Sequence, residues 1–266
     1  MTTERAREGG CAIAVMAKLP RPGQVKTRLV PPLTAEAAAA LSASFLRDIT
    51  ENVRLAARDA TISGYVAYAP AGQEKLFDGA LAAGTRLVLA DGTGVSMPGV
   101  EGFGRCLVHA TESLFARGHD AVCLLNSDSP TLPTVLLSQA AHALAESGER
   151  IVLGPADDGG YYIIGMKAVH VHLFENITWS TDAVADETRQ RARALGLPVV
   201  ELETWYDVDD AASLARLCRH VGSDSSVAGL SPYSAPATAD CIMRLHIRDR
   251  LNAACASNSD RPSRSF

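Results

Sequence analysis

The sequence predicts an α/β protein with an open, mostly parallel sheet and helices on both faces. Short apolar runs bounded by polar turns indicate buried strands, and the longer segments between them carry apolar residues at helical spacing. Strand followed by helix, repeated, is typical of a parallel sheet covered on both sides. In such sheets ligands bind at the carboxyl ends of the strands, so the polar clusters that follow strands are the first candidates for a functional site.

The elements follow from these patterns in order along the chain. We expect strands at residues 11–17, 62–69, 86–90, 121–125, 151–153, 161–166 and 199–202. We expect helices at residues 34–57, 73–81, 103–114, 133–144, 184–195 and 214–221. Thr34 is suited to an N-cap and Pro133 to a first helical turn. Residues 1–221 are expected to form one domain, and residues 222–266 a partly disordered extension with a short helix near 242–251.

The bulk properties of the 266 residues predict a soluble protein without nucleic-acid or membrane partners. The formal net charge is −5, whereas binding to nucleic acid or to anionic membranes requires a basic surface. No segment approaches the ~20 apolar residues of a membrane-spanning helix. The six cysteines include no C-x-x-C pair, which favours reduced thiols over a zinc site. We therefore expect a cytoplasmic protein, and its oligomeric state is left open.

A basic segment, KLPRPGQVKTRL, follows the first predicted strand. Arg21, Lys26 and Arg28 place three cations within eight residues of an acidic protein. Gly23 permits a tight turn, and backbone N–H groups beside guanidinium groups suit a polyphosphate. The segment matches neither the Walker A nor the G-x-G-x-x-G pattern, and a solvated basic loop is the alternative. We expect Arg21, Gly23, Lys26, Thr27 and Arg28 to bind a nucleotide, with Lys26 and Arg28 also acting in catalysis.

Two acidic turns follow later strands. Asp128 lies in NSDSPTLP, after the strand at 121–125, where a carboxylate can hold Mg²⁺ against bound phosphates. Asp207 and Asp209 lie in YDVDD after the last strand, and in extended backbone they point the same way. The alternative is helix capping, by Asp128 or a neighbouring serine in the first turn and by Asp209 or Asp210 in the second. We expect Asp128, Asp207 and Asp209 to bind Mg²⁺ or Mn²⁺, and Asp128 to be catalytic.

A further turn, GPADDGG, precedes the strand YYIIGM. Glycines here would let a substrate lie against the backbone, and an ordinary turn is the alternative. Trp179 would line the same pocket, although a buried core tryptophan is equally compatible with the sequence. We expect Asp158, Gly159, Gly160, Tyr161 and Trp179 to bind the acceptor.

Four segments, AVMAKLPRPGQVKTRL, LLNSDSPTLP, VLGPADDGGYYIIGM and YDVDDAASL, resemble in this order the family called rSAM/selenodomain-associated transferase 1. That family is similar to 2-phospho-L-lactate guanylyltransferase and, more distantly, to nucleotide-diphospho-sugar transferases of glycosyltransferase-A fold. The resemblance covers about residues 12–221 and implies this fold, with the basic segment as the phosphate loop and Asp128 and Asp209 as metal-binding acids. Two positions depart from the family pattern: Ser213 replaces the last acid of D-x-D-T-P-E-D-L, and Asn126 replaces a glycine.

These features together predict a transferase that depends on Mg²⁺ or Mn²⁺. The favoured reaction is nucleotidyl transfer from a nucleoside triphosphate to a small phosphorylated or acidic acceptor, which requires no covalent intermediate. Glycosyl transfer from a nucleotide sugar is the alternative. A third possibility is a nucleotide-binding module without turnover, because the second acidic turn departs from the family pattern.

Overall fold

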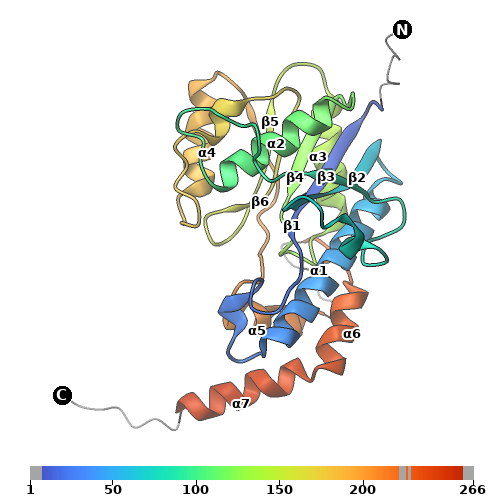
Figure 1. Cartoon of the computed structure of the whole chain (residues 1–266), viewed down its shortest axis with the longest axis vertical. Coiled ribbons are helices and arrows are strands. Elements are labelled where there is room, and N and C mark those ends of the chain that lie inside the picture. Colours follow the sequence, from blue (N-terminus) through green and yellow to red (C-terminus); the bar gives the residue numbers. More distant parts are fainter. Residues whose placement is uncertain (1–7, 222–225, 227–228, 260–266) are drawn as a thin grey trace, which may run out of the picture.

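The computed structural model describes residues 8–221, 226 and 229–259, and it contains one seven-stranded sheet (Figure 1). The strand order is β3-β2-β1-β4-β6-β5-β7. Only β6 runs antiparallel to its neighbours β4 and β5 within this sheet. The strands are β1 (Cys11–Lys18), β2 (Ile62–Ala69), β3 (Arg86–Leu89), β4 (Ala121–Leu125), β5 (Ile151–Pro155), β6 (Tyr161–Met166) and β7 (Val199–Glu201). The predicted open, mostly parallel α/β sheet is confirmed.

Helices lie between all consecutive strands except β5 and β6, which a turn joins, and they continue beyond β7. The α-helices are α1 (Ala35–Ala56), α2 (Phe103–Phe115), α3 (Thr134–Ala145), α4 (Val184–Ala194), α5 (Ala211–His220), α6 (Pro236–Arg244) and α7 (Ile247–Ser259). Short 3-10 helices are η1 (Thr27–Leu29), η2 (Glu74–Phe77) and η3 (Val171–Phe174). Thr34 caps α1 by accepting a hydrogen bond from the Ala37 N–H, as its position in the sequence predicted.

The sheet separates two hydrophobic cores. Along β1, Ile13 and Val15 belong to the core on the side of α1 and α3, whereas Ala12 and Ala14 belong to the core on the side of α2, η3 and α4. This alternation follows from the two-residue period of a strand. Both faces of β1 are therefore buried, as expected for a central parallel strand.

Two helical segments differ from the prediction. Residues 73–81 form only the short η2, because Asp78 has a non-helical ψ of 124° and Gly79 has a φ of 73°. The helix expected near 242–251 is instead two helices, α6 and α7, which are separated at His246 with a φ of 50°. A positive φ in a residue other than glycine is incompatible with a continuous right-handed helix.

The C-terminal helices pack on the body of the protein (Figure 1). Helix α6 lies against α1, and α7 lies against α5. Their side chains Cys241, Ile242, Ile247 and Leu251 belong to the core on the α1 side. The boundary at residue 221 stays a prediction, and the predicted disorder of the C-terminal end falls outside the described residues. Among the helices in the described part of the chain, none has the length and apolar character needed to cross a bilayer.

Candidate functional site

Three predicted site residues from distant parts of the chain meet at the carboxyl edge of the sheet. The Nζ atom of Lys26 lies 2.6 Å from Oδ1 of Asp128 and 2.8 Å from Oδ1 of Asp209. It also donates a hydrogen bond of 2.7 Å to the carbonyl oxygen of Val208. The Lys26 side chain is only 6% exposed, whereas those of Asp128 and Asp209 are 32% and 39% exposed. The lysine therefore lies beneath two carboxylates that remain accessible.

The loop after β1 turns Lys26 toward these acids. Gly23 has a φ of 74°, and Lys26 itself is left-handed with φ 49° and ψ 37°. Such a conformation is uncommon in a residue other than glycine and is often found at functional sites. Leu29, which is fully buried, anchors η1 directly after this turn. The loop is thus fixed to the core on one side of Lys26.

The two acidic turns are joined through their backbones. The Val208 N–H donates to the Asp128 carbonyl oxygen at 2.9 Å. The Asp128 N–H donates to Oδ1 of Asn126 at 3.3 Å, so the residue that replaces a family glycine supports this turn. Deeper in the protein, the hydroxyl of Thr131 bonds to that of Tyr206 at 2.9 Å. These contacts hold Asp128 and Asp209 in one unit.

Helix capping in the acidic turns is assigned to residues other than the two acids that bind Lys26. Asp210 is the N-cap of α5 and accepts from the Ser213 N–H at 2.8 Å. The Ser213 hydroxyl accepts from the N–H groups of Asp209 and Asp210, each at 3.0 Å. Pro133 is the N-cap of α3. The departure at Ser213 therefore completes a capping box and leaves the Asp209 carboxylate to face Lys26.

The charges at this edge influence one another strongly. Burial opposes the charge of Lys26, but Asp128 and Asp209 outweigh it and raise the pKa of the ammonium group. Burial, followed by repulsion from Asp158, Asp209 and Asp128, raises the pKa of Asp207 to about 7. Four carboxylates therefore share one region with a single buried ammonium. Within the described residues, no three acidic, histidine or cysteine side chains are arranged as a metal site.

The remaining predicted nucleotide ligands lie at the surface of the same loop. Thr27 and Arg28 are exposed and Arg21 is half-buried. Neither Arg21 nor Arg28 makes a hydrogen bond or ion pair with its side chain in the part of the chain that the structure describes. Both guanidinium groups are therefore available to an anion.

The predicted acceptor residues have more mixed surroundings. Asp158 is exposed and its Oδ1 accepts from the Gly160 N–H at 2.8 Å, which forms a tight turn. Gly159 has a φ of 90°, and a Cβ there would lie 2.1 Å from the Asp182 carbonyl oxygen. The Asp182 backbone therefore fills the space that a side chain at position 159 would need, which explains the glycine.

The aromatic members of this group lie on the α2 side of the sheet. The Tyr161 hydroxyl is buried without a hydrogen-bond partner among the described residues, and burial raises its pKa. Trp179 is half-buried and packs edge-to-face on Phe103, with ring centroids 5.4 Å apart. Both side chains pack against the core that contains α2. Trp179 is thus neither a fully buried core residue nor free in solvent.

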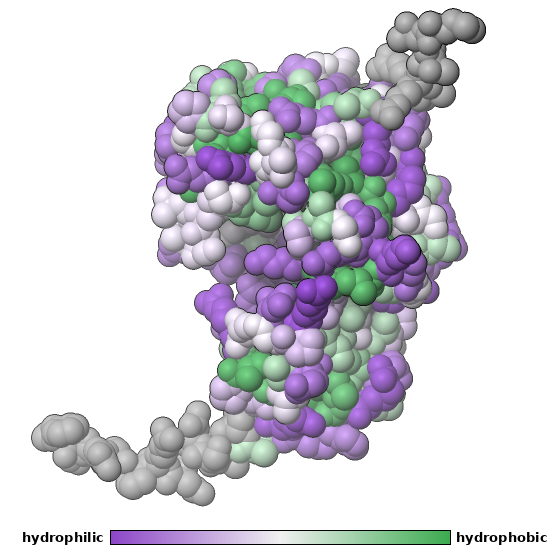
Figure 2. Space-filling model, viewed as in Figure 1, coloured by the Kyte–Doolittle hydropathy of each residue, from purple (hydrophilic) through white to green (hydrophobic). Residues whose placement is uncertain are grey.

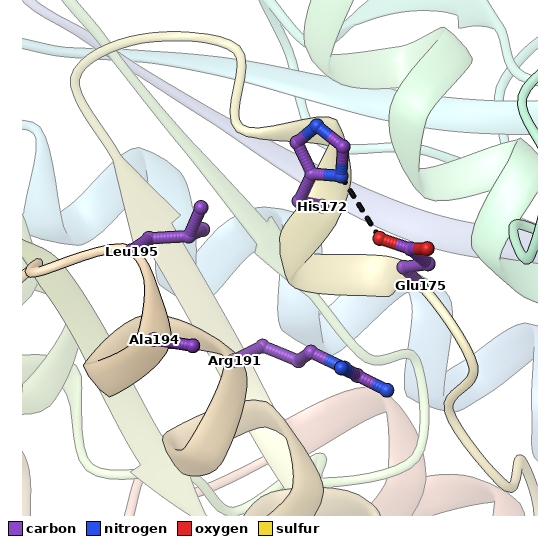
Figure 3. Close-up of a pocket in the computed structure, with 5 residues that line it drawn as sticks. All are labelled: His172, Glu175, Arg191, Ala194 and Leu195. Carbon is purple, nitrogen blue, oxygen red and sulfur yellow. Dashed lines mark hydrogen bonds and ion pairs between the residues drawn. The ribbon is translucent and has the colours of Figure 1, made fainter.

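Figure 2 shows a hollow between the upper part of the molecule, which holds α2 and α4, and the lower part, which holds α5. A different pocket, drawn in Figure 3, has a volume of 260 Å³. It is lined by residues of η3 and α4 and by the residue that follows each of them: His172, Glu175, Arg191, Ala194 and Leu195. It contains none of the predicted site residues, and its His172–Glu175 contact of 2.9 Å is a surface pair.

Sequence reasoning missed two partners of Lys26. The Val208 carbonyl oxygen accepts a hydrogen bond from the Lys26 ammonium group. The centroid of the Phe45 ring lies 5.6 Å from the Lys26 Nζ atom. No sequence signal marks a carbonyl ligand. Phe45 lies on the buried face of α1, where an aromatic residue indicates core packing. The Val208 carbonyl satisfies the third donor of the ammonium group, and the Phe45 ring lies close to the same group.

Comparisons with known proteins agree with this architecture. A family model described as "Uncharacterized protein conserved in bacteria (DUF2064)" matches residues 52–181. No curated protein matches the chain. A crystal structure from Desulfovibrio desulfuricans G20, named as a candidate nucleotide-diphospho-sugar transferase, is 27% identical with a TM-score of 0.74. The match covers 93% of this chain and 98% of that one. The chain has the fold of a nucleotide-diphospho-sugar transferase.

Two more distant structures also match the chain. CMP:2-keto-3-deoxy-manno-octonic acid synthetase complexed with CTP is 12% identical, covers 78% of this chain and 96% of its own, and has a TM-score of 0.49. A Mycobacterium tuberculosis H37Rv protein in complex with manganese is 17% identical, covers 79% of this chain and 98% of its own, and has a TM-score of 0.43. Both are too distant for their ligands to be transferred to this chain.

Proposed function

We propose that this protein is a transferase that acts on a nucleotide-activated substrate and uses Mg²⁺ or Mn²⁺. The observation that carries the proposal is the meeting of Lys26, Asp128 and Asp209 at the carboxyl edge of the sheet, with Arg21 and Arg28 on the same loop. Ligands of open α/β sheets bind at this edge. The likeness to a candidate nucleotide-diphospho-sugar transferase over 93% of the chain supports the same class of substrate.

The acids at this edge fit a divalent cation. Asp128 and Asp209 direct one oxygen each toward a single position. Asp207 and Asp158 lie close enough for their negative charges to repel each other. Carboxylate oxygens are the ligands that Mg²⁺ and Mn²⁺ prefer. Asp128 and Asp209 would hold the cation, and Asp207 would join them when it binds. The bound cation would neutralise charge on the phosphates.

The basic loop would hold the phosphates of the nucleotide. Arg21 and Arg28 have available guanidinium groups, which bind phosphate oxygens in a bidentate manner. Lys26 would add a point charge once it leaves the acids. Fixed cations around a phosphoryl group stabilise the charge that develops in the transition state.

The turn before β6 would contact the acceptor. Asp158 is near enough to the acidic edge to raise the pKa of Asp207, so a molecule bound beside this turn would lie next to the proposed cation. Gly160, Tyr161 and Trp179 would complete the acceptor contacts.

Nucleotidyl transfer to a small phosphorylated or acidic acceptor is the favoured reaction, because several cations beside one loop suit a triphosphate. Glycosyl transfer from a nucleotide sugar is the second candidate, and the name of the 27% identical structure favours it. Both reactions can use the same residues. They differ in the bond that breaks, which is to the α-phosphorus in the first and to the sugar anomeric carbon in the second.

Product analysis distinguishes the two reactions. A thermal-shift screen of nucleoside triphosphates and nucleotide sugars, each with and without Mg²⁺ or Mn²⁺, first identifies the ligand that binds. Pyrophosphate released from a triphosphate supports nucleotidyl transfer, whereas a free nucleoside diphosphate from a nucleotide sugar supports glycosyl transfer. Calorimetric binding without any product, across many acceptors, would instead indicate a nucleotide-binding module without turnover.

A further inference from the structure

The side chain of Lys26 has no hydrogen-bonding capacity left for a substrate. An ammonium group has three donors. Three oxygens lie within 2.8 Å of Nζ: Oδ1 of Asp128, Oδ1 of Asp209 and the carbonyl oxygen of Val208. The side chain is also 6% exposed. In this conformation Lys26 therefore contacts the acids and cannot reach a phosphate group.

The same conformation occupies the place that a divalent cation would need. The ammonium group lies between the two carboxylate oxygens that would be the first ligands of Mg²⁺ or Mn²⁺. Mg²⁺ binds oxygens at about 2.0–2.1 Å, so an ion shared by these carboxylates would stand where Nζ now stands. Two cations cannot share that position, because their repulsion would add to the steric conflict.

We propose that Lys26 is a built-in occupant of the cation site and that a divalent cation and Lys26 exchange places when the nucleotide binds. This inference rests on the cation site of the proposed function. In the ligand-free protein the single positive charge of Lys26 offsets part of the negative charge of Asp128 and Asp209. When a triphosphate enters, Lys26 moves to the phosphates and the carboxylates become free for the cation.

The exchange predicts positive coupling between the two ligands. Both the cation and the nucleotide bind the state in which Lys26 has left the acids, so each ligand increases the population of the state that the other requires. Cation binding without nucleotide should accordingly be weak in the native chain.

Calorimetric titration with Mn²⁺ alone, without nucleotide, tests the exchange. In Lys26→Met the competing ammonium is absent, so we expect Mn²⁺ to bind about tenfold or more tightly than to the native chain, within the usual range of coupling between sites. Arg28→Met is the matched control, because it removes a cation from the same loop that contacts neither Asp128 nor Asp209. It should change Mn²⁺ affinity much less.

The opposite result has a clear meaning. If Lys26 only holds the acids in position, Lys26→Met will bind Mn²⁺ as tightly as the native chain or more weakly. The proposed exchange is then wrong, but the proposed cation site is not contradicted. If Asp128→Asn and the native chain both fail to bind Mn²⁺, even with nucleotide, the proposed cation site fails as well. Circular dichroism shows whether each variant is folded.

A structure of the native chain with Mn²⁺ keeps the test independent of the variants. We expect the ion between Asp128 and Asp209, with Nζ of Lys26 withdrawn from both carboxylates. An ion bound to these acids while Nζ keeps its present contacts would overturn the exchange.

Discussion

At the scale of single residues, Lys26 is the centre of the candidate site. Its charge is stabilised by Asp128 and Asp209 although its side chain is almost fully buried. In the presence of saturating Mn²⁺ the acids are occupied and Lys26 is available to the nucleotide. Lys26→Ala should then remove a charge-assisted contact of about 1.5–3 kcal/mol, which lowers nucleotide affinity by roughly one to two decades.

Isothermal titration of the nucleotide identified by the thermal-shift screen measures this loss. The native chain and Lys26→Ala are compared at one salt concentration, because phosphate contacts weaken as ionic strength rises. Unchanged affinity in a folded Lys26→Ala variant would contradict the assignment of the loop to the phosphates.

A second residue-scale prediction separates the acids of the site from the acid of the cap. Asp128→Asn keeps the size of the side chain but removes the charge that faces the cation, so metal-dependent turnover should fall at least about 100-fold, as expected when charge stabilisation in a transition state is lost. Asp210→Asn is the control, since Asn caps a helix as well as Asp and Asp210 does not contact Lys26. Steady-state rates with Mn²⁺ measure both. Full activity of Asp128→Asn would remove Asp128 from the mechanism.

At the scale of elements, the strands and the polar clusters after them could be predicted from the sequence, because buried strands of a parallel sheet have continuous apolar runs. Because Lys26 follows β1 and Asp128 follows β4, their position at one edge of the sheet could be predicted as well. Their direct contact could not be predicted, since it depends on the left-handed backbone of Lys26. The packing role of Gly159 could not be predicted either, because a sequence does not show that the Asp182 backbone lies against it.

Gly159 provides the element-scale prediction. It ties the turn between β5 and β6 to the start of α4, since its carbonyl accepts from the Ala185 N–H at 2.9 Å. Gly159→Ala would place a Cβ 2.1 Å from the Asp182 carbonyl oxygen at a φ of 90°. Gly148 is a matched control because its φ is 87° and a Cβ added there would have no neighbouring atom within 4 Å.

Urea denaturation compares the two substitutions. Gly148→Ala should cost about 1–2 kcal/mol, the cost of a left-handed backbone alone. Gly159→Ala should cost about 1–3 kcal/mol more, because the added methyl group overlaps backbone that cannot move freely. Equal losses in the two variants would show that the Asp182 backbone relaxes without penalty, and that packing does not explain this glycine.

At the scale of the whole molecule, the C-terminal helices are attached to the sheet through α1. Asp48 on α1 is 1% exposed, and its carboxylate accepts from the N–H groups of Ala237 and Thr238 at 3.0 and 2.7 Å. These N–H groups belong to the first turn of α6, where they have no partner within the helix and a negative charge is favourable. The sequence did not show this attachment, because a single Asp within an apolar helix face carries no signal of its partner. A composition rich in Ser, Ala and Pro instead suggested a loose extension.

The attachment predicts how stability depends on pH. Burial raises the pKa of Asp48 above 3.8, against the opposing effect of its hydrogen bonds to Thr238 and Ala237. The folded protein therefore holds this proton more tightly than the unfolded chain, and the contribution of Asp48 to stability decreases as the pH rises from 3.8 through the folded pKa. Asp48→Asn keeps an acceptor oxygen for α6 and cannot ionise, so it should remove this decrease.

Urea unfolding of the native chain and Asp48→Asn at a series of pH values measures the difference. Asp240→Asn, on the exposed side of α6, is the control. Identical pH dependence in the native chain and Asp48→Asn would mean that the pKa of Asp48 is the same in the folded and unfolded states, which contradicts the raised pKa.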